Sequence, residues 1–319
     1  MNLIMNAFAF HEKYGNSMQL ANTADKEKLS LYMKNMSVSL ISARKNNPDC
    51  EVMAVINMEL PEEYRKILEN EGVVVRIVPF DRFTMPKHMA WSLAFYKLCA
   101  LENIARSTDY ENILLIDTDT ISMQGFDDIW REASNGLLLY SVNHTYSHKD
   151  RALIRNIYEK LYPGENKNII HYGGEFICGS RECVGRLIDE CGAVYKKIEA
   201  VNFDIHEETG DEAILSIAAS HYREKADIYD GGPYIYRYWT DVNYLVSTNT
   251  VNNPVCIWHL PAEKDMGMIY IYEYYCKHGT FPDKERAAHI FGIHKAKRPF
   301  SFLHLIIRGK RKQRHLKSR

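Results

Sequence analysis

The chain has 319 residues, of which 46% are hydrophobic and 25% charged, with a formal net charge of −1, as is typical of a soluble globular protein. No apolar run approaches the roughly 20 residues that a membrane-spanning helix needs, which excludes an integral helical membrane protein. Seven scattered cysteines without a Cys-x-x-Cys pair exclude a disulfide framework and predict reduced thiols in a cytoplasmic setting.

Strands and helices are predicted to alternate through the first 116 residues. The start has no basic segment and only a short apolar run, which predicts a strand over about 3–8 rather than a signal peptide. Apolar spacing and turn residues then predict a helix over 26–44 capped by Asp25, a strand over 51–56, a helix over 61–70, a strand over 73–78, a helix over 88–105 and a strand over 113–116. This order predicts a doubly wound, mostly parallel α/β sheet flanked by helices.

The second half is predicted to contain fewer strands and more polar segments. In order, the pattern predicts a short helix over 126–131, a strand over 136–142, a helix over 151–161, a glycine-dense strand over 171–180, helices over 181–199 and 211–219, a turn-rich region over 228–240 and a last strand over 253–259. Glycines inside a strand usually mark a bulge or the close approach of a ligand.

Asp117 and Asp119 follow the fourth predicted strand, at the edge of the sheet where ligands gather in open α/β folds. Alternate side chains of an extended segment point the same way, so the two carboxylates can converge. Converging carboxylates repel each other unless a proton or cation lies between them, and Mg²⁺ or Mn²⁺ prefers such oxygen ligands. The alternative is a plain turn, in which Asp and Thr bond to the nearby backbone.

The succession of apolar strand, Asp117-Thr118-Asp119, short helix and glycine-rich strand resembles the GT-A glycosyltransferases over about residues 1–265. In that family the Asp-x-Asp pair holds a divalent metal against the diphosphate of a sugar nucleotide. Two retaining groups are similar to this chain, the glycogenin-like and lipopolysaccharide galactosyltransferase group and the blood-group-like α-galactosyltransferase group. The resemblance implies a Mn²⁺- or Mg²⁺-dependent hexosyltransferase that uses a nucleoside diphosphate sugar and retains the anomeric configuration.

Two segments resemble donor-contacting parts of these groups. Phe95-Tyr96-Lys97-Leu98 is similar to a Tyr-Arg-Leu segment whose Arg contacts the donor, which implies that role for Lys97, although Lys offers a point charge in place of a fork. Gly173 and Gly174 belong to a strand that resembles the one lining the sugar pocket. The alternatives are a solvated helix lysine and a bulged core strand.

Two further segments resemble catalytic and metal-binding parts. Gly210-Asp211-Glu212 is similar to an acid pair at a helix start, which implies Glu212 as first and Asp211 as second candidate for the carboxylate below the anomeric carbon. The alternative is that both acids favour a helix N-terminus. Trp258 to Lys264 resembles His-x-x-Gly-x-x-Lys, which implies His259 as third metal ligand and Lys264 as phosphate-binding, although Ala262 replaces the Gly and one residue is missing before Lys264.

Two other functions remain open. Residues 113–121 also fit the Asp-x-Asp of haloacid dehalogenase-type phosphatases, but that family places this motif on its first strand. It also has Gly-Asp-x-x-x-Asp later, where this chain has Leu215 for the second Asp. The second alternative is a sugar-nucleotide or glycan-binding protein without catalysis.

The last 25 residues differ from the rest. Residues 295–319 hold ten of the 40 Lys and Arg and no acid, so 1–294 carry a net charge of −11. We therefore predict a domain over 1–294 and a separate basic tail, whose apolar patch over 300–307 lies between basic clusters. Such a tail suits an anionic membrane surface, so we expect peripheral binding at the inner face and a cell-surface glycan or lipid-linked acceptor. A disordered end is the alternative; nucleic acid is not expected, because the domain is acidic.

Overall fold

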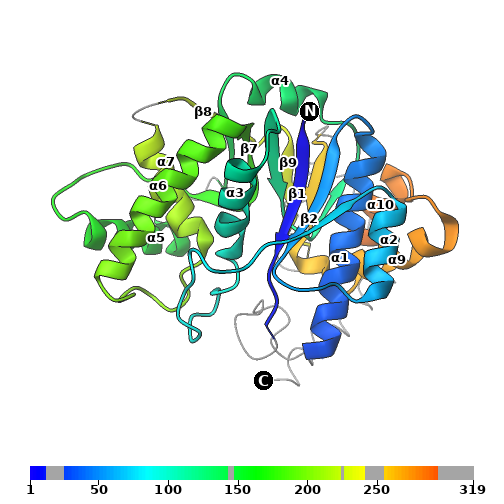
Figure 1. Ribbon diagram of the computed structural model, residues 1–319, viewed down its shortest axis with the longest axis horizontal. Coiled ribbons are helices and arrows are strands. Elements are labelled where there is room, and N and C mark those ends of the chain that lie inside the picture. Colours follow the sequence, from blue (N-terminus) through cyan, green and yellow to red (C-terminus); the bar gives the residue numbers. More distant parts are fainter. Residues whose placement is uncertain (12–24, 143–146, 224–225, 241–254, 294–319) are drawn as a thin grey trace.

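The computed structural model describes residues 1–11, 25–142, 147–223, 226–240 and 255–293. At its centre lies a seven-stranded mixed sheet in the order β3-β2-β1-β4-β7-β6-β8 (Figure 1). Its strands are β1 (Leu3–Phe8), β2 (Glu51–Ile56), β3 (Val74–Ile77), β4 (Asn112–Ile116), β6 (Leu137–Ser141), β7 (Tyr172–Ser180) and β8 (Ile228–Asp230). The first four strands in the chain are parallel to one another, as the alternation of strands and helices predicts.

The glycine-rich β7 runs antiparallel between β4 and β6. Its pairing with β4 places Phe176 opposite Ile116, and the amide of Asp117 donates to the carbonyl oxygen of Glu175 at 3.3 Å. The middle of β7 therefore lies beside the last residues of β4, where the aspartate pair begins.

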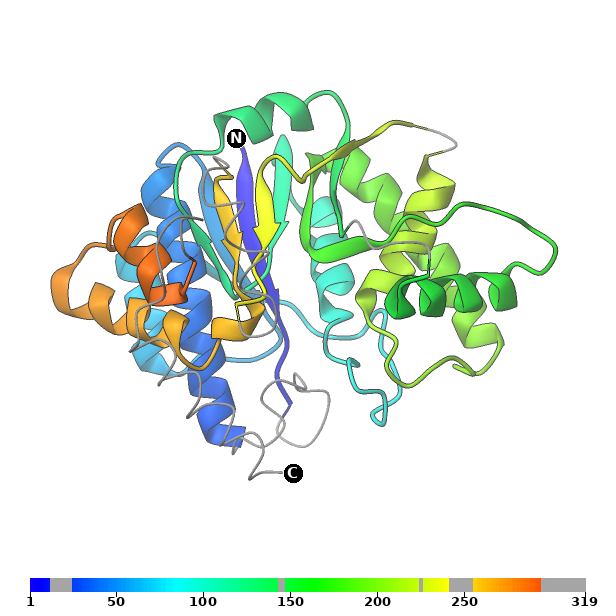
Figure 2. The same cartoon turned by 180° about the vertical axis from the view of Figure 1, so that it is seen from behind.

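Helices cover both faces of the sheet because its central strands are apolar on both sides. Leu3 and Met5 of β1 face a core shared with α3, α5, α6 and α7, whereas Ile4 and Phe8 face a core shared with α1, α2 and α4 (Figures 1 and 2). These helices are α1 (Asp25–Asn46), α2 (Glu62–Asn70), α3 (Tyr96–Ser107), α4 (Asp127–Ala133), α5 (Lys149–Leu161), α6 (Arg181–Ala200) and α7 (Asp211–Tyr222).

A second sheet brings the C-terminal part of the domain to the aspartate pair. It contains β5 (Thr120–Ser122), β9 (Ile235–Arg237) and β10 (Ile257–His259), in the order β5-β10-β9. Because β10 is antiparallel to β5, His259 lies opposite Thr120, one residue from Asp119. A short 3₁₀ helix (Pro261–Glu263), α9 (Gly267–His278) and α10 (Lys284–Phe291) follow, and α9 packs against α1.

Most predicted elements are confirmed within two or three residues, and the predicted helix over 88–105 is the main exception. It begins only at Tyr96, because the preceding segment is a series of turns in which the amides of Met89, Ser92 and Ala94 each bond to the carbonyl three residues earlier. Ala90 also donates to the carbonyl of Glu207 at 3.1 Å, which holds this segment away from a helical path.

Helices α9 and α10 and the short strands β5, β8 and β9 were not predicted. The last predicted strand begins only at Ile257, and its residues 253–254 lie outside the described part of the chain. The basic tail also lies outside it, so the division at 294/295 stays a prediction. No helix of the described segments combines the length and apolar character needed to cross a bilayer.

Candidate metal centre and charged cavity

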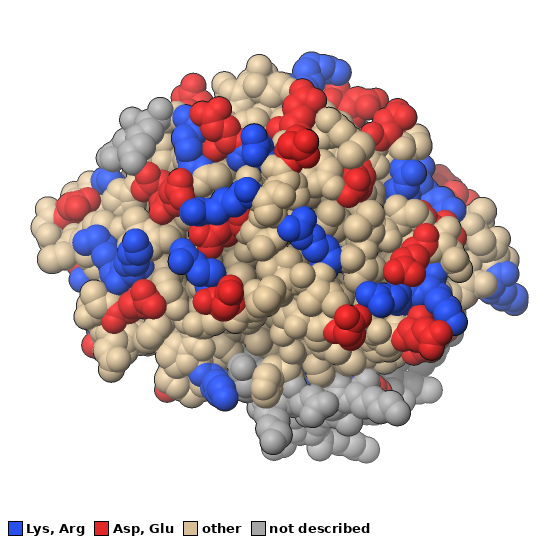
Figure 3. Space-filling model, in the orientation of Figure 1, with Lys and Arg blue, Asp and Glu red and all other residues tan. Residues whose placement is uncertain are grey.

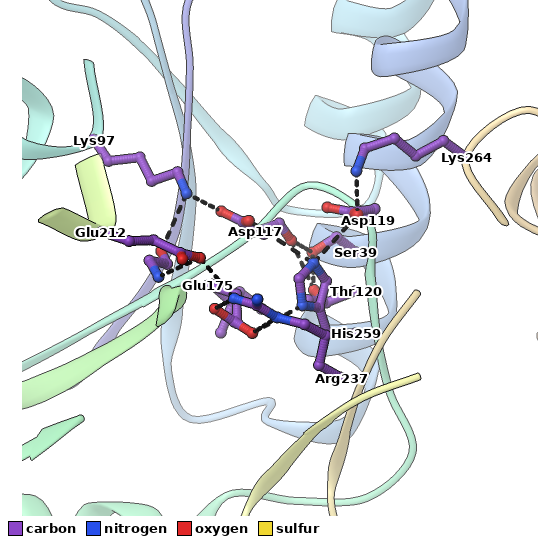
Figure 4. Close-up of polar contacts among 12 residues, drawn as sticks. Ser39, Lys97, Asp117, Asp119, Thr120, Glu175, Glu212, Arg237, His259 and Lys264 are labelled. Atoms are coloured by element: carbon purple, nitrogen blue, oxygen red, sulfur yellow. Dashed lines mark hydrogen bonds and ion pairs between the residues drawn. The ribbon is translucent and has the colours of Figure 1, made fainter. Parts of the chain in front are cut away.

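Three side chains that can bind a metal meet beyond the carboxyl end of β4 (Figure 4). Asp117 follows β4, Asp119 precedes β5 and His259 ends β10; one ligand atom from each lies within 4.8 Å of the others. The Nε2 atom of His259 is 3.2 Å from Asp119 Oδ2 and 3.8 Å from Asp117 Oδ2. Asp119 and His259 are buried, and Asp117 is partly exposed to the cavity.

The turn that carries the two aspartates is fixed from beneath. Thr120 Oγ1 donates to the carbonyl of Asp117 at 2.8 Å, and the Ser39 hydroxyl on α1 lies 2.7 Å from Thr120 Oγ1. Asn6, buried in β1, donates to the carbonyl of Ile116 at 2.7 Å. The backbone bonds expected of a plain turn are therefore present, and they leave both carboxylates free to converge.

Glu175 orients the histidine. Its Oε1 lies 3.1 Å from His259 Nδ1, on the side of the ring away from the aspartates. When Nδ1 donates its proton to Glu175, Nε2 presents a lone pair to the two carboxylates, which is how histidine binds metals. Two carboxylates and one imidazole suit Mn²⁺ or Mg²⁺, so the residues fit a divalent cation.

Lys264 and His259 supply positive charge to the aspartates. Lys264 Nζ bonds to Asp119 Oδ2, and its backbone carbonyl accepts from Asn35 of α1 at 2.8 Å. Burial alone would raise the pKa of Asp119, but Lys264 and His259 hold it well below its usual range. Burial would likewise lower the pKa of His259, but Asp119 and Glu175 raise it to about 9.

Asp211 and Glu212 begin α7 on the other side of the cavity. Lys97, on α3, bridges Asp117 and Asp211, with Nζ 2.8 Å from Asp117 Oδ1 and 3.2 Å from Asp211 Oδ2. Burial raises the pKa of Asp211 to about 6, even though Lys97 opposes the shift.

Glu212 is held in its ionised form. Its Oε1 accepts from Arg237 Nη2 at 2.6 Å, and its Oε2 lies 2.7 Å from His171 Nε2. Although burial alone would raise the pKa of Glu212, Arg237 and His171 keep it at about 2. The two acids of the predicted pair thus differ in pKa, which is raised for Asp211 and lowered for Glu212.

These groups share one cavity of about 620 Å³. Seven predicted site residues line it, together with four aromatic side chains: Lys97, Asp117, Asp119, Asp211, Glu212, His259 and Lys264, with Phe8, Tyr32, Trp91 and Trp239. The cavity is large enough for a drug-sized ligand. Both charged groups and aromatic rings therefore line it.

The predicted glycines lie behind this charged lining. A Cβ atom on Gly174 would lie 2.2 Å from Asp211 Oδ2, and one on Gly173 would lie 2.0 Å from Glu175 Oε2. The two glycines therefore make room for buried carboxylates, and their contact with a donor stays a prediction.

Three polar residues of the site were not predicted: His171, Glu175 and Arg237. Glu175 had a signal in the sequence, since an acid inside an otherwise apolar and glycine-rich strand must be paired when it is buried. Arg237 and His171 had none, because their partners lie far away in the chain.

No protein-family model and no curated protein sequence matches the chain. Solved structures do match. Mouse xyloside xylosyltransferase 1, in its apo form, has a TM-score of 0.51 at 10% identity over 83% of this chain and 100% of its own. The galactosyltransferase LgtC, in complex with donor and acceptor sugar analogs, has a TM-score of 0.52 at 14% identity over 92% of this chain and 95% of its own. At such low identity the similarity shows the fold, which is that of the GT-A glycosyltransferases, as the sequence resemblance implied.

Proposed function

We propose that this chain is a metal-dependent glycosyltransferase that moves a hexose from a nucleoside diphosphate sugar to a cell-surface glycan or lipid-linked acceptor, with retention. The observation that supports this most directly is the convergence of Asp117, Asp119 and His259 on one side of a cavity whose other side carries Asp211 and Glu212. The GT-A fold supports the same reaction class by analogy.

The metal-binding side of the cavity suits the leaving group. Mn²⁺ or Mg²⁺ bound by Asp117, Asp119 and His259 would neutralise the departing diphosphate as a Lewis acid. Lys264 and Lys97 reach the same region, and their ammonium groups are suited to phosphate oxygens, although each pairs with an aspartate in this structure.

The acid-bearing side suits the sugar. As the bond from the anomeric carbon to the diphosphate breaks, the sugar becomes cation-like, and the Glu212 carboxylate can stabilise it or form a bond to that carbon. The acceptor hydroxyl then attacks from the face that the diphosphate left. As its oxygen bonds to the anomeric carbon, the bond to Glu212 breaks, and the hydroxyl proton passes to an oxygen of the departed diphosphate. Two successive displacements retain the configuration. Asp211, with a pKa of about 6, is the second candidate for this role.

A panel of nucleoside diphosphate sugars tests the proposal. We expect slow hydrolysis of one donor that requires Mn²⁺ or Mg²⁺, stops with EDTA and is absent in Asp119→Asn. Donor binding measured by calorimetry without any turnover would favour the non-catalytic alternative. Hydrolysis of simple phosphate monoesters through Asp117 would favour the phosphatase. If the protein neither binds nor hydrolyses any donor of the panel, the proposal is refuted.

Part of the proposal rests on the sequence alone. The acidic domain and the basic tail suggest that the protein works at an anionic membrane surface, where a lipid-linked acceptor would be held. On the face shown in Figure 3, lysine and arginine side chains of the described residues are interspersed with acidic ones, so that face offers no basic patch for a polyanion.

A further inference from the structure

A continuous series of charged groups joins the metal-binding side of the cavity to the acid-bearing side (Figure 4). His259 Nδ1 lies 3.1 Å from Glu175 Oε1. Arg237 donates to both oxygens of Glu175, through Nε and Nη2, at 2.5 Å each. The same Nη2 donates to Glu212 Oε1 at 2.6 Å.

We propose that Glu175 is a positioning residue that sets the orientation of the metal ligand His259 and, through Arg237, of the acid Glu212. The inference rests on the proposed function and adds to it a group that touches neither metal nor sugar. It also predicts that the two sides of the cavity are coupled through one carboxylate.

The burial of Glu175 supports a positioning role. Its side chain is fully buried, and a buried carboxylate is costly unless it is paired and hydrogen-bonded. Both of its oxygens are hydrogen-bonded. Gly173 leaves the space that they occupy, because a Cβ atom there would lie 2.0 Å from Oε2 and 2.7 Å from Arg237 Nη2. An apolar residue on this strand would pack without these requirements.

On the metal side, Glu175 fixes one ring nitrogen so that the other can bind. A carboxylate on Nδ1 sets both the tautomer and the ring plane of a ligating histidine. Without it, the imidazole can rotate, and His259 loses the alignment that places Nε2 near both aspartates. Removing such a partner typically weakens metal binding by about 10- to 100-fold.

On the acid side, Glu175 fixes Arg237. The guanidinium is planar, so its two bonds to the Glu175 carboxylate fix the orientation of the whole group, including the Nη2 atom that contacts Glu212. Arg237 then holds Oε1 of Glu212 while His171 holds Oε2, which fixes the plane of the Glu212 carboxylate. Misplacement of a reacting group by 1 Å can cost about 100-fold in rate.

The first experiment measures Mn²⁺ binding by electron paramagnetic resonance of the free ion, which needs no turnover. In Glu175→Gln the amide has a single acceptor oxygen, so its NH2 group faces a donor of Arg237 or of His259 and the side chain must shift away from one of them. We expect its Mn²⁺ affinity to fall about 10- to 100-fold. Glu102→Gln is the matched control, because Glu102 is a mostly buried carboxylate on α3 held by Arg82 and Arg106, away from the cavity. It should bind Mn²⁺ as the wild type does.

The outcomes separate the two claims. A wild-type protein that binds no Mn²⁺ would overturn the proposed metal site and this inference with it. Mn²⁺ binding by the wild type with equal affinity in folded Glu175→Gln would overturn the positioning role alone. If Glu175→Gln does not fold, Glu175→Asp replaces it. Asp keeps the negative charge that pairs with Arg237, but its side chain is one methylene too short to hold both Arg237 and His259. Unchanged Mn²⁺ affinity in Glu175→Asp would equally overturn the positioning role.

The second experiment tests coupling to Glu212 by donor hydrolysis at saturating Mn²⁺. Glu175→Gln should lower kcat about 100-fold in the wild-type background. In a Glu212→Gln background the same change should alter kcat by less than about threefold, because the group it positions is already gone. Equal losses in both backgrounds would show that Glu175 does not act through Glu212.

Discussion

Gly174 lies in β7 directly against the ion pair of Lys97 and Asp211. A Cβ atom at this position would lie 2.2 Å from Asp211 Oδ2 and 3.0 Å from Lys97 Nζ, whereas ordinary van der Waals contact begins at 3.4 Å. In Gly174→Ala the Asp211 carboxylate must therefore move by more than 1 Å, and the 3.2 Å contact with Lys97 cannot persist. Overpacking of this kind typically costs about 1–3 kcal/mol of folding free energy.

Urea unfolding measures this cost, and the chain offers a matched control. Gly185 lies inside α6, and a Cβ atom there would meet nothing within 4 Å. Gly185→Ala should therefore stabilise the protein by about 0.5–1 kcal/mol, because Gly weakens helix interiors. Gly174→Ala should lose both stability and turnover.

Two results would refute the reasoning about Gly174. Wild-type stability in Gly174→Ala would show that Asp211 is not held against β7. Unchanged stability with a weaker donor affinity, measured by calorimetry, would show instead that the glycine contacts the donor, as the sequence resemblance implied.

Three further predictions follow from the site and the tail. Asp119→Asn should abolish both Mn²⁺ binding and metal-dependent hydrolysis, while its circular dichroism spectrum shows a folded protein. Retention of either the binding or the hydrolysis would contradict the metal site. Glu212→Gln should lower kcat by about 100-fold or more with donor affinity nearly unchanged, the mark of an interaction made in the transition state. Unchanged kcat with a lower Tm would instead assign Glu212 to the helix start. Deletion of residues 298–319 should release the protein from anionic vesicles, and salt should weaken binding of the full chain; equal vesicle binding by both forms would show that the tail is not the anchor.

The aspartate pair could be predicted because its signal is local. Four apolar residues leading into Asp-x-Asp describe a buried strand and the sheet edge where it ends, and both features are confirmed. Lys97 and His259 required the family resemblance, since nothing in their own neighbourhoods distinguishes them from surface or structural residues. The structure brings both to the aspartates.

Glu175 shows why the rest could not be predicted. Its partners His259 and Arg237 lie 84 and 62 residues away, and nothing in their spacing indicates that β9 and β10 pass beside β7. The start of α3 is a similar case. The apolar spacing from residue 88 is compatible with a helix, but the bond from Ala90 to Glu207 depends on a segment more than a hundred positions later. Tertiary contacts decide such details, and local propensity carries no information about them.

The pairing of β10 with β5 also determines when the site can form. Lys264 and Asp119 are 145 residues apart in the chain, although they are bonded in the folded domain. At a synthesis rate of about 5–20 residues per second, the aspartates precede their basic partners from the ribosome by roughly 7–30 s. Until then Asp117 can pair with Lys97, whereas Asp119 lacks both His259 and Lys264, and a chain that ends before β10 would lack a metal ligand. Since the ligands come from both halves of the chain, a bound cation would stabilise the complete domain rather than its N-terminal half, and metal affinity would report that synthesis and folding are finished.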